Sequence, residues 1–274
     1  MTMRFLEIGG GDKVPALGLG TWMMGERARD AAGEIAALKL GLDLGMSLID
    51  TAEMYGDGGA EEVVRQAMSG RRDAVFLVSK VLPQNASRKG TVKACEASLK
   101  RLGTDRLDLY LLHWRGGVPL EETLDGFAAL KKAGKIRHWG VSNFDMADLH
   151  ALGGTPAANQ VLYNLTRRGI EWNLLPWSRE HRVFVMAYSP IEQGRILGNR
   201  TLARLARERG CSAAQLALAW VLGRDGVVAI PKASSLDHVR ENRAALDIEL
   251  SAAEGAALDV AFPPPTAAHP LEML

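Results

Sequence analysis

The chain alternates eight times between a short apolar run of strand length and a longer amphipathic stretch rich in alanine, leucine and glutamate. We predict strands over residues 16–20, 47–50, 75–80, 107–113, 136–141, 159–162, 183–188 and 227–230. We predict helices over residues 31–41, 60–68, 90–102, 120–132, 146–152, 172–181, 212–222 and 235–245. Strict alternation of this kind places parallel strands inside and helices outside. Eight such units in about 250 residues are typical of the α/β fold known as the (β/α)₈ or TIM barrel.

The rival architecture is an open, doubly wound sheet, which needs a phosphate-binding glycine loop after an early strand. The early glycines lie in GLGLGTWMMG, where Gly18, Gly20 and Gly25 do not have the G-x-G-x-x-G spacing. No acidic residue follows at the expected place in a second strand. We therefore favour the barrel.

Both ends of the chain lie outside the alternating pattern. Residues 3–8 and 13–15 are short extended stretches around GGGD, so we predict a β-hairpin with residues 9–11 as its turn rather than a phosphate loop. The last segment, AFPPPTAAHPLEML, cannot continue a helix through its three consecutive prolines and is predicted to be a short C-terminal tail on the surface. Because no shift in composition divides the chain, residues 1–274 are predicted to form a single domain.

Composition narrows the class of protein. Hydrophobic residues make up 47% of the chain and charged residues 24%, the balance of a globular protein with a large core. A formal net charge of +1, with scattered basic residues, argues against nucleic acid or an anionic membrane as partner. No apolar signal core or bilayer-spanning stretch is present, and the six histidines and two cysteines lack the spacing of metal ligands. We therefore expect a cytoplasmic enzyme without a metal.

Three of the predicted strands end in ionisable side chains. Asp50 ends SLID, Lys80 ends VFLVSK and His113 ends LDLYLLH, while Tyr55 follows Asp50 by five residues. A charged residue at the end of a buried strand is costly unless it faces a polar cavity. Active sites of barrels lie at the carboxyl ends of their strands, so we expect these four side chains to converge.

The chemistry of the four groups suggests proton delivery by the tyrosine. Free tyrosine has a pKa of about 10, and a neighbouring ammonium lowers the pKa of such a group. Lys80 is predicted to supply that charge, Asp50 to hold Lys80, and a neutral His113 to bind a substrate oxygen. Tyr55 would then protonate an oxygen that becomes an alkoxide. A carbonyl accepts such a proton only if a hydride reaches its carbon, which points to a nicotinamide cofactor.

Several segments together resemble the aldo-keto reductase family. They are GLGTW, LIDTAEMYGDG, VFLVSK, DLYLLHW, GKIRHWGVSNF, NQVLYN, VMAYSP and AIPKASSLDHVREN, and the resemblance runs from residue 5 to about residue 265. It implies a (β/α)₈ barrel whose N-terminal hairpin closes the bottom, and a catalytic tetrad at Asp50, Tyr55, Lys80 and His113. The implied activity is NADPH-dependent reduction of aldehydes and ketones to alcohols.

The resemblance also implies a set of cofactor contacts. Ser142, Asn143 and Gln160 would bind the nicotinamide carboxamide, Tyr188 would stack on its ring, and Lys232 would meet the 2′-phosphate. The remaining implied cofactor contacts are Thr21, Asp50, Ser189, Pro190, Ile191, Gln193, Gly194, Ser234, Ser235, His238, Glu241 and Asn242.

One position departs from the family pattern. Where the family commonly has an arginine, this chain has His238. Histidine is often uncharged near neutral pH, whereas arginine stays charged and binds phosphate through two parallel hydrogen bonds. We therefore predict a preference for NADPH that is softer than usual, with NADH also accepted. Arg240 and Arg243 are candidates to compensate for the missing arginine.

The substrate is predicted to be a small or moderately apolar carbonyl compound. The resemblance places Trp22, Tyr55, His113 and Trp114 around the substrate, with Met24 and the tail near Pro265 as weaker candidates. The sequence is most similar to bacterial members that reduce methylglyoxal and related 2-oxoaldehydes, and aromatic aldehydes are also expected. Two alternatives remain: an NADPH-binding regulatory or sensor subunit, and a barrel isomerase or lyase without a redox cofactor. We expect a monomer.

Overall fold

The computed structural model describes residues 3–8 and 11–274, which contain one eight-stranded parallel sheet and one two-stranded hairpin. The parallel strands follow one another in chain order around the sheet. They are β3 (Gly18–Gly20), β4 (Leu48–Asp50), β5 (Phe76–Val81), β6 (Leu107–Leu112), β7 (Ile136–Ser142), β8 (Ala158–Leu162), β9 (Phe184–Tyr188) and β10 (Val227–Ala229). Each lies within two residues of its predicted bounds.

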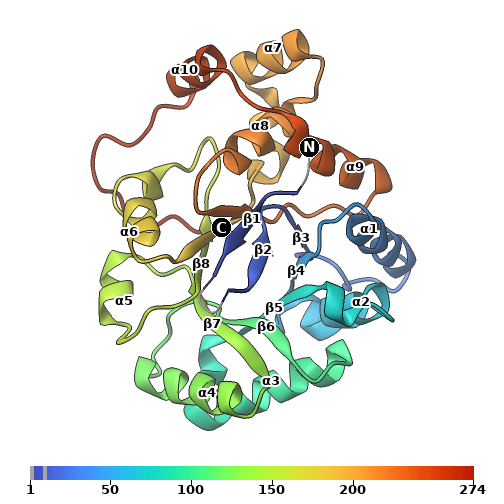
Figure 1. Ribbon diagram of the computed structural model, residues 1–274, viewed down its shortest axis with the longest axis vertical. Coiled ribbons are helices and arrows are strands. Elements are labelled where there is room, and N and C mark those ends of the chain that lie inside the picture. Colours follow the sequence, from blue (N-terminus) through green and yellow to red (C-terminus); the bar gives the residue numbers. More distant parts are fainter. Residues whose placement is uncertain (1–2, 9–10) are drawn as a thin grey trace.

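The sheet closes between its first and last strands. Parallel bridges join Leu17 to Ala229 and Gly20 to Lys232, so β3 meets β10. A Cβ atom at Gly20 would lie 2.7 Å from the carbonyl oxygen of Ile230, so only glycine allows this close backbone approach. The predicted (β/α)₈ barrel is therefore confirmed (Figure 1).

Helices surround the barrel (Figure 1). The eight predicted helices are α1 (Ala31–Asp43), α2 (Gly59–Ala67), α3 (Arg88–Leu102), α4 (Leu120–Lys132), α5 (Met146–Ala151), α6 (Leu174–Glu180), α8 (Ala213–Leu222) and α9 (Leu236–Ala244). Two further helices, α7 (Arg200–Arg209) and α10 (Ala252–Ala261), were not predicted and pack on each other at the periphery. Their start signals are present in the sequence: Asn199 caps α7, and Ser251 with Glu254 forms a capping box for α10.

The hairpin closes one end of the barrel, as predicted. Strands β1 (Phe5–Glu7) and β2 (Lys13–Pro15) pair antiparallel and lie across the barrel's centre in Figure 1. Ile8 and Val14 pack against Leu48 and Phe184 in the apolar interior of the barrel. Phe184 is the first residue of its strand, so the hairpin covers the amino end. The predicted turn at residues 9–11 lies partly outside the described residues, which do not include Gly9 and Gly10.

The inward-facing side chains change from apolar to polar along five of the strands. Side chains two apart on a strand share a face, so the residue two positions after an interior apolar residue also points inward. The interior residue and its successor are Leu48 and Asp50, Val78 and Lys80, Leu111 and His113, Ala158 and Gln160, and Met186 and Tyr188. The carboxyl end of the barrel is therefore lined by polar groups above an apolar floor.

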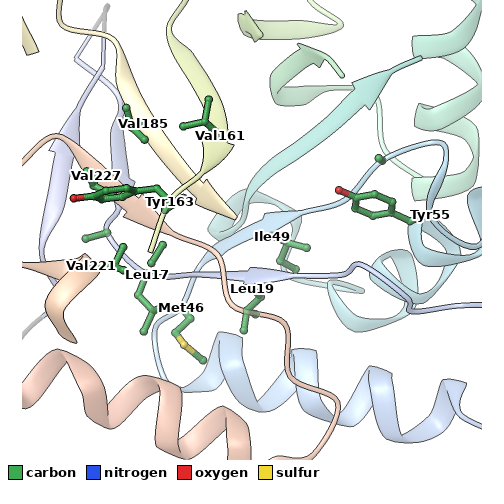
Figure 2. Close-up of a cluster of buried hydrophobic side chains, with 14 of the residues drawn as sticks. Leu17, Leu19, Met46, Ile49, Tyr55, Val161, Tyr163, Val185, Val221 and Val227 are labelled. Atoms are coloured by element: carbon green, nitrogen blue, oxygen red, sulfur yellow. The ribbon is translucent and has the colours of Figure 1, made fainter. Parts of the chain in front are cut away.

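The alternate residues face the helices. Ile49, Val161, Val185 and Val227 belong to the larger apolar cluster between barrel and helices, where Val221 of α8 joins them (Figure 2). Because each strand is buried on both faces, it reads as a continuous apolar run in the sequence. Among the described residues, no helix is long and apolar enough to cross a membrane.

Candidate active site

Lys80 is the centre of the predicted tetrad. Its side chain is fully buried at the end of β5, and Nζ donates to Asp50 Oδ2 at 2.9 Å, to the carbonyl oxygen of Thr51 at 2.8 Å and to Tyr55 Oη at 3.1 Å. A lysine ammonium has three N–H donors, and all three are used. Because the tyrosine oxygen accepts from Lys80, its own hydrogen must point elsewhere.

Burial and charge act in opposite directions on this pair. Burial lowers the pKa of Lys80, but Asp50 and Tyr55 outweigh it, so this pKa lies above its usual value and the group is an ammonium at neutral pH. Burial raises the pKa of Tyr55 and outweighs the opposing effect of Lys80. The predicted net lowering of the tyrosine pKa is therefore wrong for this structure. Tyr55 holds its proton, and Lys80 stabilises the tyrosinate that a proton transfer would leave.

Asp50 is held at both carboxylate oxygens. Oδ2 accepts from Lys80, and Oδ1 accepts from Gln160 Nε2 at 2.7 Å. The backbone N–H and hydroxyl of Thr21 both donate to the Asp50 carbonyl oxygen, at 3.1 and 2.9 Å. Thr21 and Gln160, predicted as cofactor contacts, therefore support the tetrad directly.

His113 extends the ladder of β6, since its backbone N–H donates to the Val81 carbonyl oxygen. Its ring lies edge-on to Tyr55, with centroids 5.8 Å apart, and Nδ1 is buried without a hydrogen-bond partner. Burial, with help from the Lys80 charge, lowers the pKa of His113 to about 2. The imidazole is therefore neutral, as predicted, and its ring lies beside that of Tyr55.

This depressed pKa predicts a pH dependence of stability. The unfolded histidine has a pKa of 6.5, so below pH 6.5 the unfolded chain binds a proton that folded His113 refuses. The free energy of unfolding should therefore fall by up to about 1.4 kcal/mol per pH unit as the pH drops. Urea unfolding of wild type and His113→Asn would measure this. The stability advantage of the wild type should shrink by about 2 kcal/mol between about pH 7.5 and 5, and a constant difference would contradict a neutral His113.

The four residues predicted around the substrate form a continuous row of rings. Trp22 meets Tyr55 edge-on at 5.1 Å, and His113 meets Trp114 at 4.8 Å. Trp22 is 47% exposed, so it forms the rim, while the tyrosine and histidine form the floor. The weaker candidate Met24 is fully buried and does not face this space.

The predicted nicotinamide contacts lie beside the tetrad at the ends of β7, β8 and β9. Asn143 links them: its Nδ2 donates to Ser142 Oγ and to the His113 carbonyl oxygen, both at 3.2 Å, and its Oδ1 accepts from Tyr188 Oη at 3.0 Å. Burial raises the pKa of Tyr188 to about 12. The backbone of Asn143 is left-handed, with φ 58°. Strained backbone of this kind concentrates at functional sites.

The loop after β9 contains the predicted pyrophosphate contacts. Ser189 and Gln193 have left-handed backbones, Pro190 is buried, Ile191 is half-buried, and Gly194 has φ 86°, a conformation that favours glycine. Sequence reasoning missed the group that anchors this loop. Glu192 is 4% exposed, and its carboxylate accepts from Asn164 at 2.7 Å, Arg195 at 2.9 Å and Arg167 at 3.1 Å.

The predicted contacts to the adenosine end lie between β10 and α9. Lys232 and Ser234 are exposed, with Nζ 3.3 Å from Oγ. Ser235 caps α9 by accepting from the backbone N–H of His238, whose side chain is exposed on the first turn. Glu241 and Asn242 are half-buried further along the same helix. These residues lie together but are separate from the tetrad.

Sequence reasoning also missed the path of the C-terminal tail. Glu272 pairs with Arg167 at 2.5 Å, and the Leu274 backbone hydrogen-bonds Tyr188. The tail therefore returns to the carboxyl end of the barrel. Apart from one acidic residue, no pattern in PLEML indicates this return.

The site therefore defines a barrel enzyme built to protonate a carbonyl oxygen. Among the described residues no cluster of possible metal ligands occurs, and both cysteines are free. Residues 16–261 match the model of the aldo/keto reductase family. The chain belongs to this family.

Relatives with known names support the assignment over the whole chain. Methylglyoxal reductase YeaE of Escherichia coli is 51% identical over 284 residues, covering 100% of both chains. An aldo-keto reductase of Klebsiella pneumoniae, crystallised in complex with NADPH, is 52% identical, with a TM-score of 0.97 and complete coverage of both chains. Glyoxal reductase of Bacillus subtilis is 33% identical, covering 90% of this chain and 88% of its own.

Proposed function

We propose that this protein is an NADPH-dependent reductase of small aldehydes and ketones, with methylglyoxal and related 2-oxoaldehydes as its leading substrates. One observation carries the proposal: Lys80 uses all its donors on Asp50, Thr51 and Tyr55. This leaves the hydrogen of the Tyr55 hydroxyl free to be donated, beside the neutral ring of His113. Both the methylglyoxal reductase YeaE and the NADPH-bound Klebsiella enzyme match the full chain.

The residues beside the tetrad fit a nicotinamide dinucleotide phosphate. Ser142, Asn143 and Gln160 offer both donors and acceptors, which suit a carboxamide. Tyr188 is half-buried at the end of a barrel strand, where an aromatic ring can support a flat ligand. Gly194, half-buried and without a side chain, lets a ligand approach the backbone closely. When bound, the cofactor supplies a hydride for the carbonyl carbon.

The chain's own groups perform the proton chemistry in this proposal. The neutral His113 hydrogen-bonds the carbonyl oxygen and orients it toward Tyr55 Oη. Tyr55 donates its proton as that oxygen gains negative charge. Lys80, fixed by Asp50, holds the resulting tyrosinate in a dry environment. Trp22 and Trp114 shield the reacting atoms from water and favour apolar substrates.

Turnover separates this function from its alternatives. We expect NADPH to be oxidised with methylglyoxal and 4-nitrobenzaldehyde, and far more slowly with a sugar phosphate, because two indoles and a neutral imidazole line the substrate space. Steady-state NADPH oxidation across this panel, with fluorescence titration of NADPH as a binding control, is the measurement. Tight NADPH binding without turnover would favour the sensor subunit, and absence of binding would favour a redox-free isomerase or lyase.

We also propose that the 274 residues act as a single-domain, cytoplasmic monomer without a nucleic-acid partner. The balanced charge and continuous barrel support this view. Sedimentation at the mass of a dimer would contradict it.

A further inference from the structure

A cavity of about 410 Å³ lies beside the carboxyl ends of β3 and β10. The bridge between Gly20 and Lys232 brings the β3–α1 loop against the segment that follows β10. Residues lining the cavity include Met23, Glu26, Arg27, Asp30, Lys232 and Ser234. It therefore adjoins the predicted adenosine end of the cofactor site from the side of α1.

Two cations in this cavity have no acidic partner among the described residues. Within residues 3–8 and 11–274, the Arg27 guanidinium has no hydrogen bond or ion pair, and the Lys232 ammonium hydrogen-bonds only the Ser234 hydroxyl. The neighbouring Arg29, in contrast, has an acidic partner, because its Nε lies 3.8 Å from Asp30 Oδ1. Unpaired basic side chains facing one cavity favour an anionic ligand.

The acidic side chains of the cavity only partly oppose this charge. Asp30 is engaged by Arg29, and the Glu34 carboxylate accepts from the Gly25 backbone N–H at 3.0 Å. Glu26 is exposed and is the remaining acidic group of the lining. A ligand phosphate would therefore be attracted by Arg27 and Lys232 and repelled by Glu26.

We propose that Arg27 is a specificity-determining residue that, with Lys232, recognises the adenosine 2′-phosphate of NADPH. The inference rests on the proposed function, and it explains which residue would make the protein prefer NADPH to NADH. His238, on the first turn of α9, is a weak substitute for an arginine because it cannot offer paired N–H donors to a phosphate. The guanidinium of Arg27, from the β3–α1 loop, can supply those donors instead. Arg27 would then offset the weaker NADPH preference that is expected from His238.

Calorimetric titration with 2′,5′-ADP and 5′-ADP tests this contact without any turnover. Arg27→Gln should weaken 2′,5′-ADP binding about 10- to 100-fold, the range for a lost hydrogen bond to a charged group, and should change 5′-ADP binding less than about twofold. Arg29→Gln, a matched change at a paired arginine in the same cavity, should weaken 2′,5′-ADP binding much less than Arg27→Gln does, because it removes no free donor and only leaves Asp30 without its partner. Glu26→Gln should strengthen 2′,5′-ADP binding.

Cofactor kinetics give a second readout. Arg27→Gln should lower the NADPH-to-NADH ratio of kcat/KM by a similar factor, and His238→Arg should raise that ratio in both the wild type and the Arg27→Gln protein. An unchanged 2′,5′-ADP affinity in Arg27→Gln, or an equal loss for both nucleotides, would overturn the proposal. Since nucleotide binding is measured without a carbonyl substrate, failure of this inference can be told apart from failure of the reductase assignment.

Discussion

Tyr55→Phe should lower kcat for carbonyl reduction about 10²- to 10⁴-fold, the contribution typical of a positioned general acid. The substitution removes only the hydroxyl that accepts from Lys80 Nζ and would protonate the carbonyl oxygen. The ring contacts with Trp22 and His113 can remain. NADPH affinity should therefore be unchanged. Single-turnover reduction of methylglyoxal, with a fluorescence titration of NADPH, measures both quantities.

Tyr110→Phe is the matched control for this change. Tyr110 is fully buried on β6, packs edge-on against Phe127, and its hydroxyl has no hydrogen-bond partner. Loss of an unsatisfied buried hydroxyl should be neutral or stabilising and should leave kcat unchanged. A near-wild-type kcat in Tyr55→Phe would remove the tyrosine from the proton-transfer step.

Lys80→Met should abolish measurable reduction and also destabilise the fold. The change leaves the buried Asp50 carboxylate without its ammonium, and removing one partner of a buried ion pair costs about 3–5 kcal/mol. It also removes the charge that stabilises tyrosinate. Urea unfolding gives the free energy of unfolding, and the carbonyl panel gives activity.

The double variant Asp50→Asn/Lys80→Met separates stability from chemistry. Asparagine is neutral and can still accept from Gln160, so much of the lost stability should return. Activity should not return, because no ammonium remains beside Tyr55. Recovery of kcat together with stability would mean that the ion pair serves only the fold.

The alternation of side chains along the strands explains why so much of the site could be predicted. Asp50, Lys80 and His113 each follow an interior apolar residue by two positions, so their place at the carboxyl end of the barrel follows from strand geometry. Positions at the adenosine end are different, because Lys232 and His238 are exposed and their roles rest on the family resemblance. Those roles remain predictions.

Other features depend on tertiary contacts that no local pattern encodes. The return of the tail depends on an ion pair between Glu272 and Arg167, which are far apart in the sequence. The direction of the Tyr55 pKa shift depends on how deeply the ring is buried, and the sequence shows only that Lys80 can lie nearby. Helices α7 and α10, in contrast, have N-terminal capping residues that are visible in the sequence. They were missed because neither helix belongs to the alternation of one strand with one helix.

Isotope transfer tests the central claim most directly. NADPH carrying deuterium at both nicotinamide C4 positions would be incubated with methylglyoxal and the enzyme in ordinary water, and the product alcohol examined by mass spectrometry and NMR. We expect one deuterium on the carbinol carbon and none on the hydroxyl, because the hydroxyl proton comes from Tyr55 and exchanges with solvent. An alcohol without carbon-bound deuterium, or no alcohol at all, would contradict the assignment of this protein as a hydride-transferring carbonyl reductase.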